Sequence, residues 1–206
     1  MFKIAVLISG GGTNLQALID GIHGGYLNCI IDSVISDTRD AYGLNRAEEN
    51  GIKTYVLDRK TYKDNISAEI LKLTLGKVDL IVMAGFLSIV KGNILKEFKN
   101  RIINIHPSLI PAFCGSGMYG IKVHEKALEY GVKISGCTVH FVDEGTDTGS
   151  IIIQRPTVVF PEDTAEILQK RVMIEEHKAL PEAVKLLSEG KLRVENRRVY
   201  IEDTSF

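Results

Sequence analysis

The run IINIH (102–106) carries two polar side chains in an otherwise apolar segment, and prolines follow it at Pro107 and Pro111. Side chains alternate along a strand, so Asn104 and His106 would lie on the same face. An amide N–H and a protonated imidazole are two hydrogen-bond donors that can hold one oxygen atom while negative charge develops on it. A single histidine on a strand is more often structural, and from this segment alone both roles stay open.

The segment SGGGTN (9–14) joins an apolar run to a helical pattern and is a candidate anion site. Backbone N–H groups of a glycine turn and of a helix N-terminus bind anions, and glycine lets the backbone approach a phosphate closely. The dinucleotide fingerprint needs a glycine where Leu15 stands, and the Gly-Lys-Ser/Thr of a P-loop does not follow. The pattern therefore favours a single phosphate, with a plain strand-to-helix turn as the alternative.

The segment HFVDEGTDTGS (140–150) places His140 near the end of an apolar run and then puts Asp143 and Asp147 in a polar loop. The two glycines of this loop break the ligand spacing of an EF-hand. Acidic surface loops are usually solvated turns. This loop therefore indicates a functional site only in combination with the other two segments.

The elements that must position these segments alternate between apolar, strand-like runs and helical patterns. Strands are expected at 3–9, 30–36, 54–58, 78–85 and 102–106. A first helix is expected directly after the glycines, with Thr13 or Asn14 as its N-cap. Further helices are expected at 41–50, at 61–75, and around Ile94 and Phe98. This order predicts a parallel, doubly wound α/β sheet. Such sheets bind ligands at the carboxyl ends of their strands, where both 9–14 and 104–106 fall.

The second half of the chain predicts antiparallel additions to this sheet. We expect a glycine-rich segment at 114–120, a helix at 121–131, strands at 134–143 and 150–160, a helical region from Thr164 to Glu189 interrupted at Pro181, and a hairpin at 192–202 turning at Glu195 and Asn196. The expected architecture is one domain, 1–206, with a mostly parallel sheet, flanking helices and mixed C-terminal strands.

The composition has no strong charge bias. The chain has 206 residues, 45% of them hydrophobic, with 25 basic and 26 acidic side chains. This balance gives no reason to expect a nucleic-acid or membrane-surface partner, and no run approaches the ~20 apolar residues of a membrane span. Cys29, Cys114 and Cys137 lack zinc-site spacing, and the N-terminus lacks a signal-peptide pattern, so a cytoplasmic protein is expected.

Four motifs occur together in this order: LISGGGTNLQALID, VMAGFLSIV, NIHPSLIP and VHFVDEGTDTGSII. With them the chain resembles the phosphoribosylglycinamide formyltransferase family of purine biosynthesis, from about residue 3 to residue 190. The resemblance implies a formyltransferase-like fold and direct transfer of the formyl group of 10-formyltetrahydrofolate to the amine of 5'-phosphoribosylglycinamide. The co-substrate is a folate and no metal is needed.

The resemblance also implies a catalytic trio of Asn104, His106 and Asp147, with His140 supporting it. Asn104 and protonated His106 would donate to the oxyanion of a tetrahedral intermediate. Asp147 would hold His106 and steer protons from the attacking amine to the leaving nitrogen.

Two groups of binding residues follow from the same resemblance. The phosphoribosyl substrate would contact Gly12, Thr13, Asn14 and Glu176 from the N-terminal half and the last long helix, although Glu176 alone would pass for an ordinary helix residue. The folate would contact Leu87, Ser88, Ile89, Val90, Asn104, Asp143 and Lys63. Many relatives have arginines at Ser88 and near Asn65, so the contacts to the glutamate tail stay open. The segment 113–128 is similar to a mobile loop of the family, from which Lys122 or His124 would reach the phosphate.

Several alternatives stay open. The chain would be a formyltransferase acting on another amine, a formyltetrahydrofolate hydrolase, or a non-catalytic nucleotide or sugar-phosphate binding protein. A dinucleotide-dependent oxidoreductase would use Asp37 at the end of the second strand, but Leu15 spoils its glycine pattern. A monomer and a homodimer are both compatible with the sequence.

Overall fold

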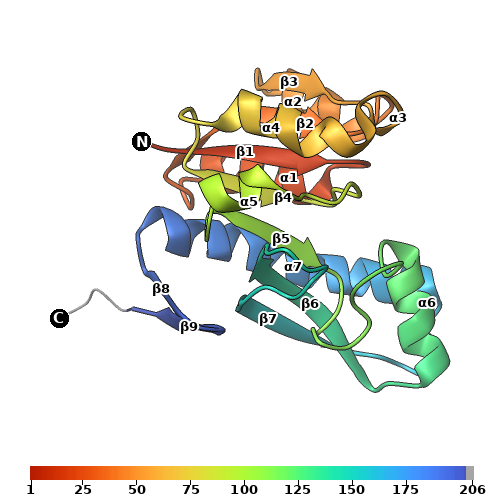
Figure 1. Cartoon of the computed structure of the whole chain (residues 1–206). Helices are drawn as coiled ribbons and strands as arrows, with labels where there is room; N and C mark the ends of the chain where they lie inside the picture. The colour runs from red at the N-terminus through yellow and green to blue at the C-terminus, as the bar shows by residue number, and fades with distance from the viewer. Residues whose placement is uncertain (203–206) are drawn as a thin grey trace.

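The computed structural model describes residues 1–202, and its main feature is a seven-stranded sheet (Figure 1). The strands are β1 (Phe2–Ile8), β2 (Cys29–Ser36), β3 (Lys53–Val56), β4 (Leu80–Met83), β5 (Ile102–His106), β6 (Ile134–Phe141) and β7 (Ile151–Val158). Their order is β3-β2-β1-β4-β5-β6-β7; β1 to β5 run parallel, and β6 and β7 add antiparallel. The predicted mostly parallel sheet with mixed C-terminal strands is confirmed.

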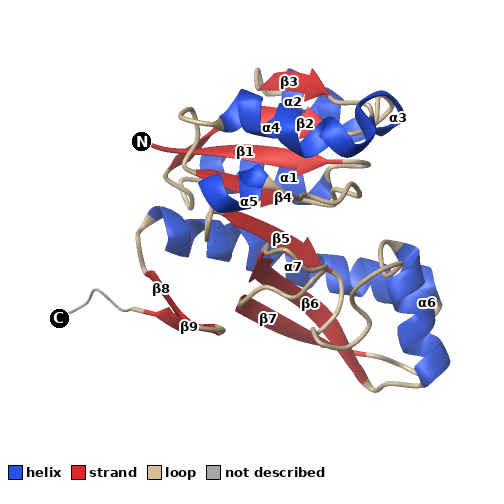
Figure 2. Ribbon diagram, viewed as in Figure 1, coloured by secondary structure: helices blue, strands red, loops and turns tan. Residues whose placement is uncertain are grey.

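Helices cover both faces of the sheet (Figure 2). One face packs against α1 (Thr13–His23), α2 (Tyr42–Glu49), α6 (Ile121–Tyr130) and α7 (Ala165–Ser188), and the other against α4 (Ile66–Thr74) and α5 (Asn93–Glu97). A short helix α3 (Arg59–Tyr62) and a 3-10 turn η1 (Lys63–Asn65) precede α4, and β8 (Leu192–Glu195) and β9 (Arg198–Ile201) form a separate hairpin.

The alternation of side chains in β1 divides the core into two layers. Ile4, Val6 and Ile8 pack on the α1 side, whereas Ala5 and Leu7 pack on the α4 side. All five side chains are completely buried. A strand covered on both faces needs this continuous apolar run, which is why β1 and β4 are evident in the sequence.

The single helix predicted at 61–75 is wrong. Asp58 caps α3 by accepting a hydrogen bond from the backbone N–H of Lys60, and α3 ends at Tyr62. Lys63 has a φ of 43°, which lies outside the α-helical range, so the helix cannot continue through this residue. The chain then passes through η1 before α4 begins. The break turns residues 63–65 away from the direction of α3.

The predicted interruption at Pro181 is also wrong, because α7 continues through this proline to Ser188. Proline removes one backbone hydrogen bond of a helix. Pro181 is buried beside Leu180 and Val184, which belong to the core on this face of the sheet. Packing of this stretch holds the helix together across the missing bond.

The hairpin predicted at 192–202 is confirmed, with its turn at Asn196 and Arg197, one residue later than expected. Within residues 1–202, no helix is long and apolar enough to cross a membrane.

Candidate active site

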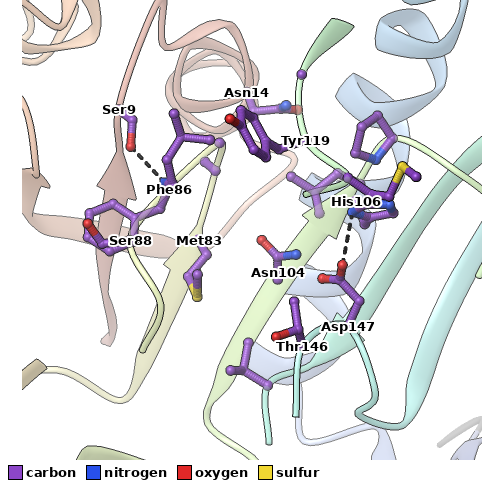
Figure 3. Close-up of a pocket in the computed structure, with 18 of the residues that line it drawn as sticks. Ser9, Asn14, Met83, Phe86, Ser88, Asn104, His106, Tyr119, Thr146 and Asp147 are labelled. Carbon is purple, nitrogen blue, oxygen red and sulfur yellow. Dashed lines mark hydrogen bonds and ion pairs between the residues drawn. The ribbon is translucent and has the colours of Figure 1, made fainter. Parts of the chain in front are cut away.

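A cavity of about 820 Å³ opens at the carboxyl ends of the parallel strands. Its walls come from the segments after β1, β4 and β5, from the loop between β6 and β7, and from α7 (Figure 3). Apolar walls with a few convergent polar groups are typical of small-molecule sites. The three segments singled out in the sequence, 9–14, 104–106 and 143–148, all contribute to it.

Asn104 lies opposite His140 in the antiparallel pairing of β5 and β6. The Nδ1 atom of His140 lies 2.8 Å from the carbonyl oxygen of Phe141, so Nδ1 carries the proton. In the neutral ring Nε2 is then an acceptor, and it receives a hydrogen bond from Nδ2 of Asn104 at 3.2 Å. This bond orients the amide, and the second hydrogen of the NH2 group remains available for a ligand oxygen.

His106 is buried beside Asn104, and a backbone carbonyl determines its tautomer. Its Nε2 atom donates to the carbonyl oxygen of Phe113 at 2.9 Å, while Nδ1 lies 3.6 Å from Oδ2 of Asp147. Burial lowers the pKa of His106, against the opposing effects of the Phe113 carbonyl and the Asp147 carboxylate. The structure therefore favours a neutral imidazole rather than the protonated one expected from the sequence, and a second proton would sit on Nδ1, facing Asp147.

Asp147 faces His106 (Figure 3) and also lies close to His140. Its Oδ1 lies 3.6 Å from Nε2 of His140, and its Oδ2 accepts a hydrogen bond from the N–H of Gly115 at 2.9 Å. Burial raises the pKa of Asp147, but the close approach of the His140 and His106 rings and the hydrogen bond from the N–H of Gly115 outweigh this effect and hold the pKa below its ordinary value. Asp147 is therefore an ionised carboxylate at neutral pH, 41 residues after His106 in sequence but beside it in space.

The glycine turn lies at the other end of the cavity. Gly12, not Thr13 or Asn14, is the N-cap of α1, with a φ of 69° that favours glycine, so the predicted side-chain cap is wrong. Thr13 and Asn14 form the first turn, whose backbone N–H groups have no acceptor within the helix. Nδ2 of Asn14 donates to Oε2 of Glu176 at 2.9 Å, and burial raises the pKa of Glu176. The four residues predicted for the phosphoribosyl substrate are thus brought together.

The segment from Leu87 to Val90 lines the cavity, as expected for the folate candidates. The N–H of Leu87 donates to Oγ of Ser9 at 2.8 Å, which ties the segment to the end of β1 (Figure 3). Oγ of Ser88 donates to Oδ2 of Asp37 at 2.6 Å, and Asp37 is completely buried. Ser88 therefore has a hydrogen-bond partner within the protein.

Asp143 also lines the cavity, but one of its oxygens is used inside its own loop. Oδ1 accepts hydrogen bonds from the N–H of Gly145 and from Oγ1 of Thr148. These bonds shape the loop that presents Asp147, so Asp143 acts at least as a support for that loop.

The cavity walls do not include Lys122, which the sequence named for the phosphate, and they do not include Lys63. It lies in η1, after the break in the predicted helix, and Arg59 lines the cavity instead. The Nη1 atom of Arg59 lies 3.9 Å from Oδ2 of Asp37. The sequence signal that points to Arg59 is Asp58, because a capping residue directly after a strand marks a helix start at the carboxyl edge.

Several further wall residues were not predicted, although Met83, Phe86 and Thr146 lie inside the quoted motifs. These further wall residues include Met83, Phe86, Tyr119, Thr146, Gln169 and Met173. His124, named in the sequence for a possible phosphate contact, also lines the cavity but is buried, and burial lowers its pKa to about 4. A neutral, buried imidazole is a poor candidate for pairing with a phosphate.

The fold and the site together define an α/β protein whose cavity combines a polar, titratable cluster, a glycine turn at a helix N-terminus and an apolar strip. Comparison with known sequences agrees: the chain belongs to the formyl transferase family, whose family description matches residues 2–184. No group of three or more His, Cys, Asp or Glu side chains in residues 1–202 is arranged to hold a metal ion.

Within this family, the chain is similar to proteins named as formyltransferases, transformylases or purine biosynthetic proteins. The chain is 40% identical over 205 residues to phosphoribosylglycinamide formyltransferase of Haemophilus influenzae, covering 98% of this chain and 94% of the relative. It is 42% identical over 201 residues to the human trifunctional purine biosynthetic protein adenosine-3, covering 96% of this chain but only 19% of that longer protein. The crystal structure of glycinamide ribonucleotide transformylase 1 from Symbiobacterium toebii superposes with a TM-score of 0.92 at 46% identity, covering 98% and 95% of the two chains.

Proposed function

We propose that the chain is a phosphoribosylglycinamide formyltransferase of purine biosynthesis. It transfers the formyl group of 10-formyltetrahydrofolate to the amine of 5'-phosphoribosylglycinamide and releases tetrahydrofolate. The observation that carries the proposal is the position of Asn104, His106 and Asp147 in one cavity with the glycine turn and the apolar strip 86–90. One substrate needs a phosphate site, the other needs an apolar slot, and the reacting atoms must meet between them.

The chemistry begins when the substrate amine attacks the formyl carbon bound to N10 of the folate. The C=O bond becomes a C–O⁻ bond in a tetrahedral intermediate, and collapse of the intermediate breaks the bond from carbon to N10. The free N–H of Asn104 donates to the oxyanion, since its other N–H is held by His140. One such donor contributes about 3–4 kcal/mol to transition-state stabilisation.

His106 and Asp147 handle the proton that the amine loses. A proton taken up at Nδ1 of His106 lies between the imidazole and Oδ2 of Asp147, 3.6 Å apart, with Nε2–H still donating to Phe113. The neighbouring carboxylate stabilises the imidazolium, which can then pass this Nδ1 proton toward N10. Proton transfer to N10 lets the folate leave as a neutral amine.

The two ends of the cavity bind the parts of the substrates that do not react. The turn at Gly12 and Thr13 takes the phosphate, and the pair of Asn14 and Glu176 takes the ribose or the glycinamide group. Leu87 to Val90 cover the pterin, with backbone groups meeting its polar edge. Arg59 replaces Lys63 in our proposal as the cation nearest the tail of the folate.

We further propose that residues 1–206 act as one domain in the cytoplasm, as a monomer or a homodimer. The cysteines at 29, 114 and 137 are all free thiols, which fits a reducing compartment. The first half of the chain then supplies most of the phosphoribosyl site, and the second half supplies Asp147 and its loop beside the folate.

Release of tetrahydrofolate tests the proposed function. The protein is incubated with 10-formyltetrahydrofolate and 5'-phosphoribosylglycinamide, and tetrahydrofolate is followed with and without the amine. We expect release that depends on the amine and is unaffected by EDTA. Equal release in both mixtures would instead support the hydrolase alternative, and no release in either would support a non-catalytic binder.

A further inference from the structure

Helix α2 contacts the outer side of the glycine turn through two hydrogen bonds. The N–H of Gly43 donates to the carbonyl oxygen of Gly10 at 3.0 Å. Nε of Arg46, one turn further along α2, donates to the carbonyl oxygen of Gly11 at 2.9 Å. Two consecutive carbonyl groups of the turn are therefore held toward α2.

The orientation of these carbonyls determines where the next N–H groups point. In a planar trans peptide the C=O of one residue and the N–H of the following residue point in opposite directions. With the Gly10 and Gly11 oxygens directed to α2, the N–H groups of Gly11 and Gly12 are directed away from α2. The turn lines the cavity, so these two N–H groups are presented to the site proposed for the phosphate.

Arg46 is itself held in place. Its Nη1 donates to Oε1 of Gln16 at 3.1 Å, and its guanidinium lies over the ring of Tyr42, 5.1 Å from the centroid. The side chain is partly buried by these contacts. A fixed guanidinium directly behind the turn also places a positive charge near the anion site.

The contact between the helix and the turn depends on two glycines. A Cβ atom on Gly12 would lie 2.6 Å from Cα of Gly43. A Cβ atom on Gly43 would lie 2.6 Å from Cδ1 of Ile8 and 3.1 Å from Cα of Gly12. Only glycine at both positions allows α2 close enough for Arg46 and Gly43 to hold the carbonyls.

We propose that Arg46, together with Gly43, is a positioning residue for phosphate binding. It acts through the Gly11 peptide rather than by touching the substrate. The inference rests on the proposed function, because it assigns the phosphate of 5'-phosphoribosylglycinamide to this turn. It adds that affinity for the phosphate depends on a side chain outside the cavity.

The test compares Arg46→Gln with Arg101→Gln. Arg101 is a matched control, because its guanidinium also donates to a backbone carbonyl and also lies over an aromatic ring, that of Phe98. The carbonyl that it contacts belongs to Glu97, outside the glycine turn and outside the cavity walls. We expect Arg46→Gln to raise KM for 5'-phosphoribosylglycinamide about tenfold, the effect of losing one hydrogen bond from a charged group, with kcat nearly unchanged. Arg101→Gln should leave both constants unchanged, and Arg46→Lys should restore part of the loss.

A substrate without the phosphate separates positioning from general damage to the fold. Glycinamide riboside should react equally poorly with the wild type, Arg46→Gln and Arg101→Gln. A similar loss on both substrates in Arg46→Gln, or no loss on the phosphorylated one, would overturn the inference.

A binding measurement keeps this inference distinct from the proposed function. Calorimetric titration with ribose 5-phosphate requires no catalysis, so it is informative even if no formyl transfer is found. Binding about tenfold weaker to Arg46→Gln than to Arg101→Gln would support the role of Arg46 in an anion site. Equal binding to the two variants would refute it, whatever reaction the enzyme catalyses.

Discussion

At the scale of single residues, backbone carbonyls set the chemistry of the cluster. The carbonyls of Phe113 and Phe141 fix which nitrogen of His106 and His140 carries the proton. The alternation in IINIH predicts that Asn104 and His106 share a face, and the structure bears this out. No sequence pattern reveals the carbonyl of Phe113, because it comes from a loop residue with a φ of 50° that long-range packing determines.

Asn104→Ala tests the oxyanion donor. We expect kcat to fall about 10²–10³-fold, because the variant removes one oriented N–H from the transition state. KM should change much less, and the unfolding midpoint should show that the fold is intact. Steady-state kinetics with both substrates near saturation measure the effect. A wild-type kcat in this variant would show that Asn104 does not stabilise the oxyanion.

At the scale of elements, the strands and the mostly parallel character of the sheet follow from the sequence, while some helix boundaries do not. The run from Leu80 to Ala84 is apolar throughout, because this strand is buried on both faces. The single helix predicted at 61–75 is wrong because the helical spacing of apolar residues continues across Lys63, whereas the helical backbone conformation stops at this residue. The same break leaves Lys63 outside the cavity walls, which include Arg59 instead.

The loop that presents Asp147 depends on Gly149. A Cβ atom there would lie only 1.8 Å from the carbonyl oxygen of Phe141, at the end of β6. We expect Gly149→Ala to displace the loop and lower kcat by more than about tenfold, with a stability loss of about 1–3 kcal/mol from overpacking. Kinetics and urea unfolding measure the two effects. Unchanged kcat would show that the position of Asp147 tolerates movement of its loop.

At the scale of the whole molecule, the parallel sheet brings the glycine turn, Asn104, His106 and Glu176 into one cavity from distant parts of the sequence. The rule that ligands bind at the carboxyl ends of strands predicts this edge. It does not predict the contributions of α6 and α7. The hydrogen bond from Asn14 to Glu176 spans 162 residues and requires the packing of α7 against the sheet.

Buried histidines make global stability depend on pH. Burial lowers the pKa of His124 from 6.5 to about 4. In mildly acid solution, therefore, the imidazole is protonated in the unfolded chain but stays neutral in the folded chain. The neutral, buried His124 therefore contributes roughly 3 kcal/mol to the free energy of unfolding. This contribution is fully present above pH 6.5 and is lost as the pH falls toward 4.

Urea unfolding at pH 7.5 and pH 4.5 measures this contribution. His124→Gln should lose less stability between the two pH values than the wild type, with a smaller remaining slope from His106, whose pKa is also lowered by burial. His23→Gln, which replaces an exposed histidine at the end of α1, is the control. Identical slopes in the wild type and His124→Gln would contradict the assigned role of burial.

The central claim is that the cavity transfers a formyl group directly from folate to the phosphoribosyl amine. A single-turnover reaction with isotopically labelled 10-formyltetrahydrofolate and 5'-phosphoribosylglycinamide, quenched and separated by chromatography, follows the label itself. We predict that it appears in the formamide of the product, in an amount equal to the tetrahydrofolate released. Label recovered as free formate, or retained on the folate, would contradict the account.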